Sequence, residues 1–274
     1  MSSEIEKLEE IARRIRRDLI TMIYLSGDGH PAPSLSAVDI ITALYFKIMR
    51  VDPSNPQWED RDRFILSKGH ACPALYAALS LKGYFPAELF PTLRYLNSKL
   101  QGHPDVKKTP GIDSTAGSLG NGISMGLGMT LAGTIMSKSY FTYVMTGDGE
   151  INEGVIWEAF MAARHLNAGR LIVFIDNNEY QSGGKVHIVS GITPILPKIE
   201  RFGWHCQEID GHNMAEILQA TKAAQEVTDS PSVIVAHTIK GKGVPFMEGN
   251  NVWHKGAPNT EQYNEAIKAL GDPE

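Results

Sequence analysis

Two polar segments in this chain each follow an apolar run, and their residue types could bind a metal ion. Asp148 lies in Thr146-Gly147-Asp148-Gly149 after residues 141–145, and Asn177-Asn178 follows residues 171–175. The spacing predicts strand, turn, helix, strand, which brings the carboxylate and the amide to the ligand-binding end of neighbouring parallel strands. Asp and Asn oxygens and a nearby backbone carbonyl suit Mg²⁺, whose remaining ligands would be phosphate oxygens and water. An isolated Gly-Asp-Gly is usually a tight surface turn, which is the alternative interpretation here. The second strand ending in Asn-Asn supports the metal site, so the two interpretations are about equally favoured.

Histidines form the second group of candidate residues. A single histidine is more often structural than catalytic, but four of the nine lie in loops flanked by Gly or Pro: His30, His70, His103 and His254. Loops at strand ends often carry function, and an imidazole can transfer protons near pH 7 or, when charged, hold a phosphate. The other five are expected to be structural or on the surface: His165, His187, His205, His212 and His237. Of these, His237 ends a strand and could line the site.

Hydrophobic periodicity predicts the elements that position these residues. A helix over 153–165 should join the two strands, with Asn152 as its N-cap and Gly169 as its stop. Residues 120–136, rich in Gly, Ala, Met and Leu, should form a tightly packed buried helix. The other predicted helices cover 4–25, 37–48 (capped by Ser36), 74–82, 194–202 and 214–227 (capped by Asn213), and the other strands cover 64–66, 204–209 and 232–236. This alternation predicts one α/β domain over 1–274, doubly wound, with a mainly parallel sheet and helices on both faces.

Composition excludes several classes of protein. With 42% hydrophobic and 21% charged residues and a net charge of −5, the chain is an ordinary globular protein. The basic cluster at 13–17 lies on an amphipathic helix, and we interpret it as a solvated or subunit-facing surface, so nucleic-acid binding is not expected. Cys72 and Cys206 make no disulfide framework and are expected to be buried thiols in a reducing compartment. Because no signal pattern or bilayer-length apolar run is present, we expect no membrane association and a cytoplasmic location.

Gly147-Asp148-Gly149, followed at this distance by Asn177-Asn178, resembles the thiamine diphosphate (ThDP) motif. Five further segments narrow the resemblance to transketolases. They fall in family order: Ser26-Gly27-Asp28-Gly29-His30-Pro31, Leu66-Ser67-Lys68-Gly69-His70-Ala71-Cys72, Gly102-His103-Pro104, Gly117-Ser118-Leu119-Gly120-Asn121-Gly122 and His254-Lys255-Gly256-Ala257-Pro258. Transketolases are usually much longer, so the chain resembles their N-terminal, diphosphate-binding domain.

The resemblance implies a role for each matching residue. The Mg²⁺ ligands would be the Asp148 and Asn178 side chains and the backbone carbonyl of Tyr180. ThDP would be bound by the Gly149 N–H, which would donate to the diphosphate, and by Gly117 and Leu119 against the aminopyrimidine. His70 and His254 would contact the diphosphate or the reacting oxygens, and His30 and His103 would bind hydroxyls of the donor sugar. Glu153 falls where the family has a buried acid at the subunit interface; its alternative is a carboxylate favoured by the helix dipole.

Two departures from the family pattern leave the substrate open. Ser118 and Asn121 stand where long transketolases typically have Pro and Gln. Lys240-Gly241-Lys242-Gly243 is more similar to other ThDP branches, such as deoxyxylulose-phosphate synthase or 2-oxo acid dehydrogenases. Both departures bear on the substrate more than on the cofactor.

The resemblance also implies a partner, because in this family a glutamate on a pyrimidine-binding domain activates ThDP. We therefore expect the chain to be inactive alone and to join a separate subunit carrying that domain, in an α2β2 assembly with closed symmetry. The leading interpretation is the N-terminal subunit of a split transketolase, which moves a two-carbon ketol unit from a ketose phosphate to an aldose phosphate. The alternatives are a subunit of another ThDP enzyme, acting on a different sugar or a 2-oxo acid, and a non-catalytic diphosphate-binding partner.

Overall fold

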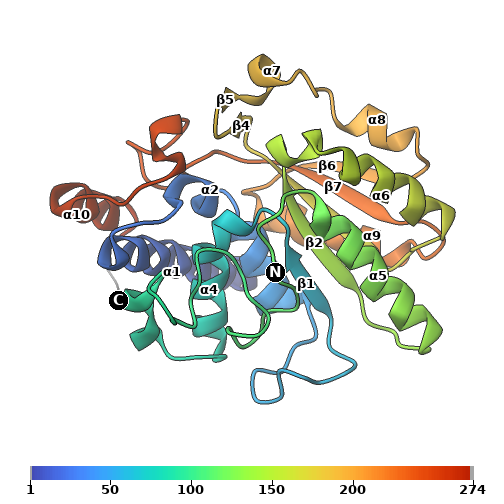
Figure 1. Cartoon of the computed structure of the whole chain (residues 1–274), viewed down its shortest axis with the longest axis horizontal. Helices are drawn as coiled ribbons and strands as arrows, with labels where there is room; N and C mark the ends of the chain where they lie inside the picture. Colours follow the sequence, from blue (N-terminus) through green and yellow to red (C-terminus); the bar gives the residue numbers. More distant parts are fainter. Residues whose placement is uncertain (1, 272–274) are drawn as a thin grey trace.

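A five-stranded parallel sheet forms the centre of the computed structural model, which describes residues 2–271 (Figure 1). Its strands are β1 (Arg63–Leu66), β2 (Thr142–Gly147), β3 (Leu171–Asn177), β6 (His205–Asp210) and β7 (Ser232–His237). They lie in the order β1-β2-β3-β7-β6, and every neighbouring pair is parallel. Two short strands, β4 (Tyr180–Gln181) and β5 (Gly184–Lys185), form a separate antiparallel hairpin. The five predicted strands are therefore confirmed.

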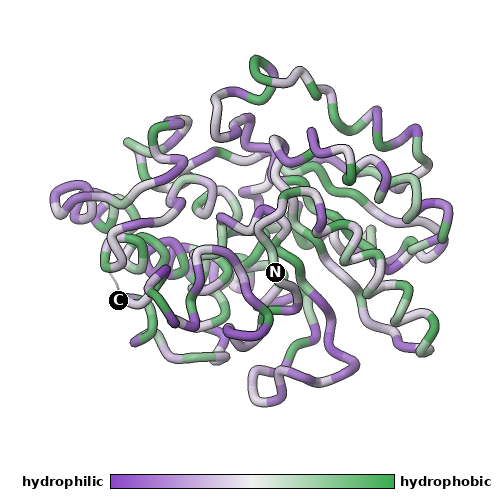
Figure 2. Tube along the Cα trace, viewed as in Figure 1, coloured by the Kyte–Doolittle hydropathy of each residue, from purple (hydrophilic) through white to green (hydrophobic). Residues whose placement is uncertain are grey.

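Helices cover both faces of the sheet, so the prediction of a doubly wound fold is confirmed. On one face, α1 (Ser2–Ser26), α3 (Val38–Ala43), α4 (Cys72–Lys82) and α9 (Met214–Glu226) share a core with Phe64, Tyr143 and Phe174. On the other, α5 (Asn121–Ile135), α6 (Gly154–His165) and α8 (Leu196–Glu200) share a core with the adjacent strand residues Ile65, Val144 and Val173. Successive strand residues point to opposite faces. Since both faces are covered, the central strands are almost continuously hydrophobic (Figure 2).

Shorter elements connect the strands and helices of these layers. The remaining helices and turns are α2 (Pro31–Leu35), η1 (Leu44–Ile48), η2 (Gly69–Ala71), η3 (Ala87–Thr92), η4 (Gly149–Asn152), α7 (Val186–Val189), η5 (Asn251–His254) and α10 (Thr260–Ala269). Among residues 2–271, no helix is both long and apolar enough to cross a bilayer.

The continuous helix predicted over 37–48, with Ser36 as its cap, is wrong. Proline at the first position starts α2 earlier, and the chain then passes through α3 into the π-helical turn η1. Ser36 is buried, and its hydroxyl donates to Asp176 Oδ2 over 2.6 Å instead of capping a helix. The correction matters because it turns Ser36 toward the end of β3.

The predicted ends of the helix over 153–165 also need correction. Glu153, not Asn152, is the N-cap residue of α6, and the Asn152 amide donates to Gly149 O within the preceding turn. The helix ends before Gly169, since Asn167 already adopts a left-handed φ of 49°. Gly169 serves packing instead, because a Cβ there would lie 2.0 Å from the Thr228 carbonyl oxygen.

Helix α5 is buried on one side only, so the prediction of a tightly packed buried helix over 120–136 is right for that side alone. Gly122, Gly126 and Gly133 lie so close to neighbouring side chains that a Cβ would come within 2.8 Å of them. The opposite side is open, and Ile135 is 84% exposed. Glycines on one side of α5 therefore bring it close to the sheet and leave an apolar face uncovered.

The basic cluster at 13–17 is not wholly solvated or subunit-facing, as the sequence had indicated. Arg16 is buried and forms two hydrogen bonds to Asp39, at 3.1 and 2.5 Å, and His212 Nδ1 lies 2.6 Å from the same carboxylate. Of the two free thiols, Cys72 is buried as expected, whereas Cys206 is only partly buried.

Candidate active site

The carboxyl ends of β2, β3 and β7 meet at one edge of the sheet, where Gly147 is paired with Asp176 and Asn177 with His237. A cavity of about 410 Å³ opens above them. Every site residue predicted from the sequence lines it: His30, His70, His103, Gly117, Leu119, Asp148, Gly149, Glu153, Asn178, Tyr180 and His254. These residues come from loops spread over most of the chain, so the fold brings together what the sequence separates.

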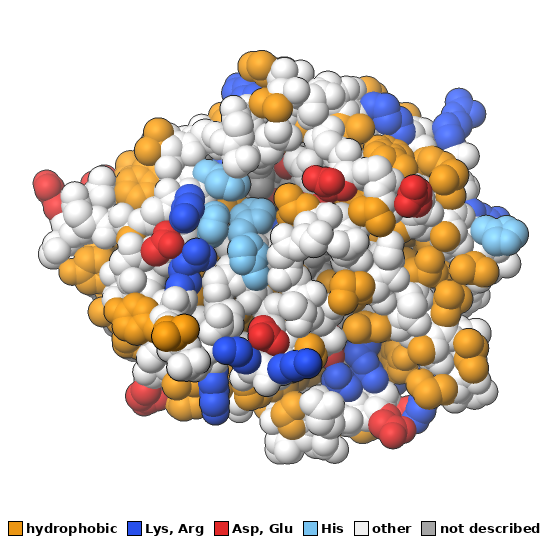
Figure 3. Space-filling view, viewed as in Figure 1, with side chains coloured by type: hydrophobic (Ala, Val, Ile, Leu, Met, Phe, Trp, Pro, Cys, Tyr) orange, Lys and Arg blue, Asp and Glu red, His pale blue; other side chains and the backbone are white. Residues whose placement is uncertain are grey.

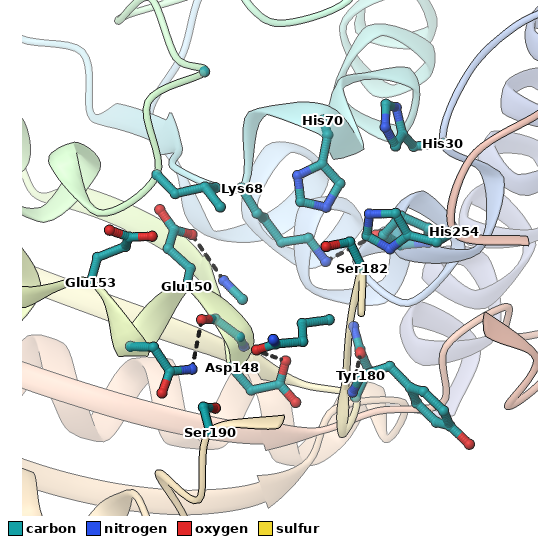
Figure 4. Close-up of a pocket in the computed structure, with 18 of the residues that line it drawn as sticks. His30, Lys68, His70, Asp148, Glu150, Glu153, Tyr180, Ser182, Ser190 and His254 are labelled. Carbon is teal, nitrogen blue, oxygen red and sulfur yellow. Dashed lines mark hydrogen bonds between the residues drawn. The ribbon is translucent and has the colours of Figure 1, made fainter. Parts of the chain in front are cut away.

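Three of the four loop histidines form a compact group at the rim of this hollow (Figure 3). The ring centroids of His30, His70 and His254 are 5.3 to 5.7 Å apart. The fourth, His103, lies against Gly117, where an added Cβ would be 3.6 Å from the imidazole. Figure 4 places His30, His70 and His254 on one side of the cavity and Glu150 and Glu153 on the other.

Burial keeps these imidazoles neutral. It lowers the pKa of His30 to about 4 and that of His254 to about 3, and holds the pKa of His70 well below its usual value. Neighbouring cations act in the same direction: Arg94 on His30, Lys240 on His254 and Lys68 on His70. Near pH 7 the group therefore offers neutral rings that can both donate and accept hydrogen bonds.

A pH dependence of stability follows from His30. Because its folded-state pKa lies below the unfolded value of 6.5, the unfolded chain binds more protons between about pH 4 and 6.5. The contribution of His30 to stability is thus fully present above pH 6.5 and is lost as the pH falls toward 4. We expect His30→Asn to reduce the slope of unfolding free energy against pH in this window, by up to about 1.4 kcal/mol per pH unit.

The measurement is urea unfolding at a series of pH values, with the exposed His165→Asn as control. Equal slopes for the wild type and His30→Asn would contradict the assignment. The charged and titratable groups around His30 are Arg94, His103, Asp28, Lys255, His70 and His254.

Asp148 has the properties expected of a metal ligand. It is 1% exposed; its Oδ1 accepts the Gly149 N–H over 2.8 Å, while its buried Oδ2 accepts no hydrogen bond from any residue within 2–271. Burial and the nearby Asp176 carboxylate raise the pKa of Asp148 to about 7. A buried carboxylate oxygen without a donor is unfavourable, and a bound cation would offset this cost.

Asn178 is held in a suitable orientation beside it. Its Nδ2 donates to Ser36 Oγ and Asp176 Oδ2 over 3.3 and 3.4 Å, while its Oδ1 accepts the Tyr180 N–H over 3.1 Å. Within 2–271, no three His, Cys, Asp or Glu residues are grouped so that they could hold a metal. These donors therefore fit a hard cation that completes its shell with oxygens from outside the chain.

A buried ion pair beneath the cavity was not predicted. Lys68, 2% exposed, donates to Pro33 O over 3.0 Å and to Asp176, which also accepts the Ser36 and Thr238 hydroxyls. Although burial by itself raises it, the pKa of Asp176 is lowered by Lys68 and these hydroxyls. The available signal was a charged residue at the end of each of two strands, Lys68 after β1 and Asp176 within β3.

Lys240 is a second residue that the sequence did not assign to the site. It is buried, and its Nζ donates to Asn251 Oδ1 over 2.5 Å and to His254 Nδ1 over 3.1 Å. Burial and the charge of Lys68 lower the pKa of Lys240 to about 8. In contrast, His237 points away from the cavity to Glu208, over 2.7 Å, so it does not line the site as the sequence had allowed.

Comparison with known proteins agrees with this geometry. Residues 8–273 match the family described as "Transketolase, thiamine diphosphate binding domain". The chain is 44% identical over 270 residues to a 6-deoxy-6-sulfo-D-fructose transketolase subunit of Clostridium sp. (strain MSTE9), covering 98% of both chains. It is 39% identical over 269 residues to an apulose-4-phosphate transketolase subunit of Phocaeicola vulgatus, covering 98% of this chain and 95% of the relative.

The fold is also that of solved transketolases. The transketolase of Leishmania mexicana superposes with a TM-score of 0.92 at 28% identity, over 96% of this chain and 41% of the longer one. The chain thus spans about two fifths of the length of that protein but nearly all of the two subunit relatives. It belongs to the transketolase family, as a thiamine diphosphate-binding domain that is similar over 98% of its length to proteins named as transketolase subunits.

Proposed function

We propose that this chain, as a single domain over 1–274, is the N-terminal subunit of a two-chain transketolase. With ThDP and Mg²⁺ it transfers a two-carbon ketol unit from a ketose phosphate to an aldose phosphate. The observation that carries the proposal is Asp148, whose buried Oδ2 has no donor within residues 2–271 and which lines a cavity together with every other residue that the family motif implies.

The residues of this chain would bind the metal and the cofactor, orient the sugar and transfer protons. Asp148, Asn178 and the Tyr180 carbonyl would hold Mg²⁺. The Gly149 N–H, which donates to Asp148 Oδ1 in this structure, would share its hydrogen between that oxygen and the diphosphate. ThDP, when bound, supplies the nucleophilic carbon and the electron sink that amino acid side chains lack. The wall at Gly117 and Leu119 supports its aminopyrimidine ring.

The neutral histidines complete the site. His70 and His254 contact the diphosphate or the reacting oxygens, and His30 and His103 hydrogen-bond the donor sugar. Because His30, His70 and His254 are neutral near pH 7, each can donate a ring N–H to a ligand oxygen. The unprotonated nitrogens of His30 and His70 can also accept a proton from one oxygen and return it to another. Glu153 is exposed at the cavity rim, which supports a contact with a second subunit.

A partner subunit is supported by an uncovered apolar face. Hydrophobic side chains are exposed along α5 and α6: Met125, Ile135, Met136, Met161 and Leu166 (Figure 3). Exposed apolar side chains grouped on neighbouring helices commonly mark a protein interface. We propose that a second chain supplies the pyrimidine-binding domain and the activating glutamate, and that an α2β2 assembly closes the symmetry. A cytoplasmic location fits the two free thiols.

The first test is affinity purification of the chain from its native extract, with mass spectrometry of the proteins retained. We expect a stoichiometric partner that carries a pyrimidine-binding domain. A substrate panel on that complex then separates the alternatives, because the two relatives are named for different substrates, 6-deoxy-6-sulfo-D-fructose and apulose-4-phosphate. Turnover of 2-oxo acids alone would favour another ThDP branch, and ThDP binding without any turnover would favour a non-catalytic role.

A further inference from the structure

Glu150 is a buried carboxylate in the cavity wall to which the proposed function gives no task. Its side chain is 3% exposed, and both of its oxygens accept hydrogen bonds. Oε1 accepts the Gly120 N–H over 2.7 Å and also the Ser67 hydroxyl, and Oε2 accepts the Gly147 N–H over 3.1 Å. Figure 4 shows Glu150 on the opposite side of the cavity from the histidine group.

The three donors belong to three separate segments of the site. Ser67 follows β1 and precedes Lys68, Gly120 follows Leu119 at the start of α5, and Gly147 ends β2 directly before Asp148. The Glu150 carboxylate therefore links three parts of the site by hydrogen bonds. They are the turn at 147–149 that carries Asp148 (the metal turn), the segment at 117–120 proposed to support the aminopyrimidine ring (the aminopyrimidine wall), and the segment that carries Lys68.

The residues around Glu150 and its three donors are closely packed. Gly120 adopts a φ of 88°, and a Cβ there would lie 2.6 Å from Val155. The Gly122 N–H donates to the Ser67 hydroxyl over 3.2 Å, and a Cβ on Gly122 would lie 2.3 Å from the same oxygen. Ser67 therefore joins the first turn of α5 to Glu150, and a shift at Glu150 must move the Leu119 wall.

The chemistry favours a positioning role over the other roles open to a carboxylate. A negative charge beside a diphosphate site weakens the binding of an anion, so charge alone gives no reason for an acid here. Glu150 is also a poor general base, because donors already occupy both oxygens. Only a group that accepts at both oxygens matches these three donors, and such charge-assisted bonds are strong and geometrically selective.

We propose that Glu150 is a positioning residue that holds the aminopyrimidine wall in register with the metal turn. This inference rests on the proposed function. Its distinctive consequence is that Glu150 matters most for a ligand that touches both the wall and the turn. ThDP does so, whereas magnesium pyrophosphate reaches only the turn.

The test compares the dissociation constants of these two ligands, measured calorimetrically on the purified native complex. Glu150→Gln keeps the shape but turns an amide N–H₂ toward N–H or O–H donors. We expect it to weaken ThDP binding by at least about tenfold, the scale set by one buried donor left without an acceptor. The affinity for magnesium pyrophosphate should fall by about threefold at most. The exposed Glu158→Gln on α6 is the matched control and should change neither.

A second variant keeps the test valid if Glu150→Gln does not fold. Ser67→Ala removes one of the three donors. It should weaken ThDP binding about threefold, less than Glu150→Gln because both backbone donors to Glu150 remain, and it should affect pyrophosphate binding less. Equal losses for both ligands would mean that Glu150 is merely structural, and unchanged binding would mean that it has no role; either result overturns the inference and leaves the proposed function intact. If the wild-type complex binds no ThDP, the proposed function fails and this inference fails with it.

Discussion

Replacing Asp148 by Ala or Asn should abolish Mg²⁺-dependent ThDP binding. Asp148 is the one carboxylate among the proposed ligands, and its Oδ2 has no other partner within residues 2–271. Loss of a direct ligand should exceed the 10- to 100-fold cost typical of residues that only support a ligand, so we expect a loss of at least about 100-fold. The measurement is ThDP titration with and without Mg²⁺, with the exposed Asp229→Ala as control.

Asp148→Asn should also stabilise the cofactor-free protein. Burial, with no donor to Oδ2 within residues 2–271, makes the charged form of Asp148 unfavourable, and Asn at this position removes the charge while it keeps the shape. We therefore expect Asp148→Asn to unfold at a higher urea concentration than the wild type at pH 8 when no metal or cofactor is present. Unchanged Mg²⁺-dependent binding in either variant would show that the metal assignment is wrong.

Replacing Lys240 by Met should be the second most damaging change. The Lys240 ammonium donates to His254 Nδ1, which leaves Nε2–H as the group that His254 can present to a ligand. It also adds a buried positive charge near a site that we propose binds an anionic diphosphate. Since Met keeps much of the volume but removes the charge and both hydrogen bonds, we expect ThDP affinity to fall by at least about tenfold.

The matched control for Lys240 is Lys242→Met, two residues further along the same loop and partly exposed. The two variants should separate clearly, with normal binding for Lys242→Met. If both variants bound ThDP like the wild type, Lys240 would only fill space, and the orientation of His254 would need another explanation.

The strands and the cavity-lining residues could be predicted because their signals are local. Each strand is an apolar run followed by a polar turn, and parallel strands necessarily bring those turns to one edge. Asp148 and Asn178 lie where this argument puts them. The family motifs then supplied the loop histidines, whose positions no periodicity could have given.

The missed features depend on contacts between segments far apart in the sequence. Arg16 was part of a basic cluster on an amphipathic helix, and only the packing of α1 against α3 shows that it is buried on Asp39. Lys68 and Asp176 were both visible at strand ends, but their pairing depends on the order of the strands. By contrast, α10 has a local signal that the sequence prediction overlooked, a capping box between Asn259 and Gln262.

A ketol-transfer assay tests the central claim most directly. The purified chain, the purified partner and their mixture would each be supplied with ThDP, Mg²⁺, a ketose phosphate and an aldose phosphate. We predict no transfer by either chain alone and transfer by the mixture that saturates at equimolar subunits. Robust transfer by this chain alone would contradict the split-enzyme account, as would a mixture that binds ThDP but transfers no ketol unit between sugar phosphates.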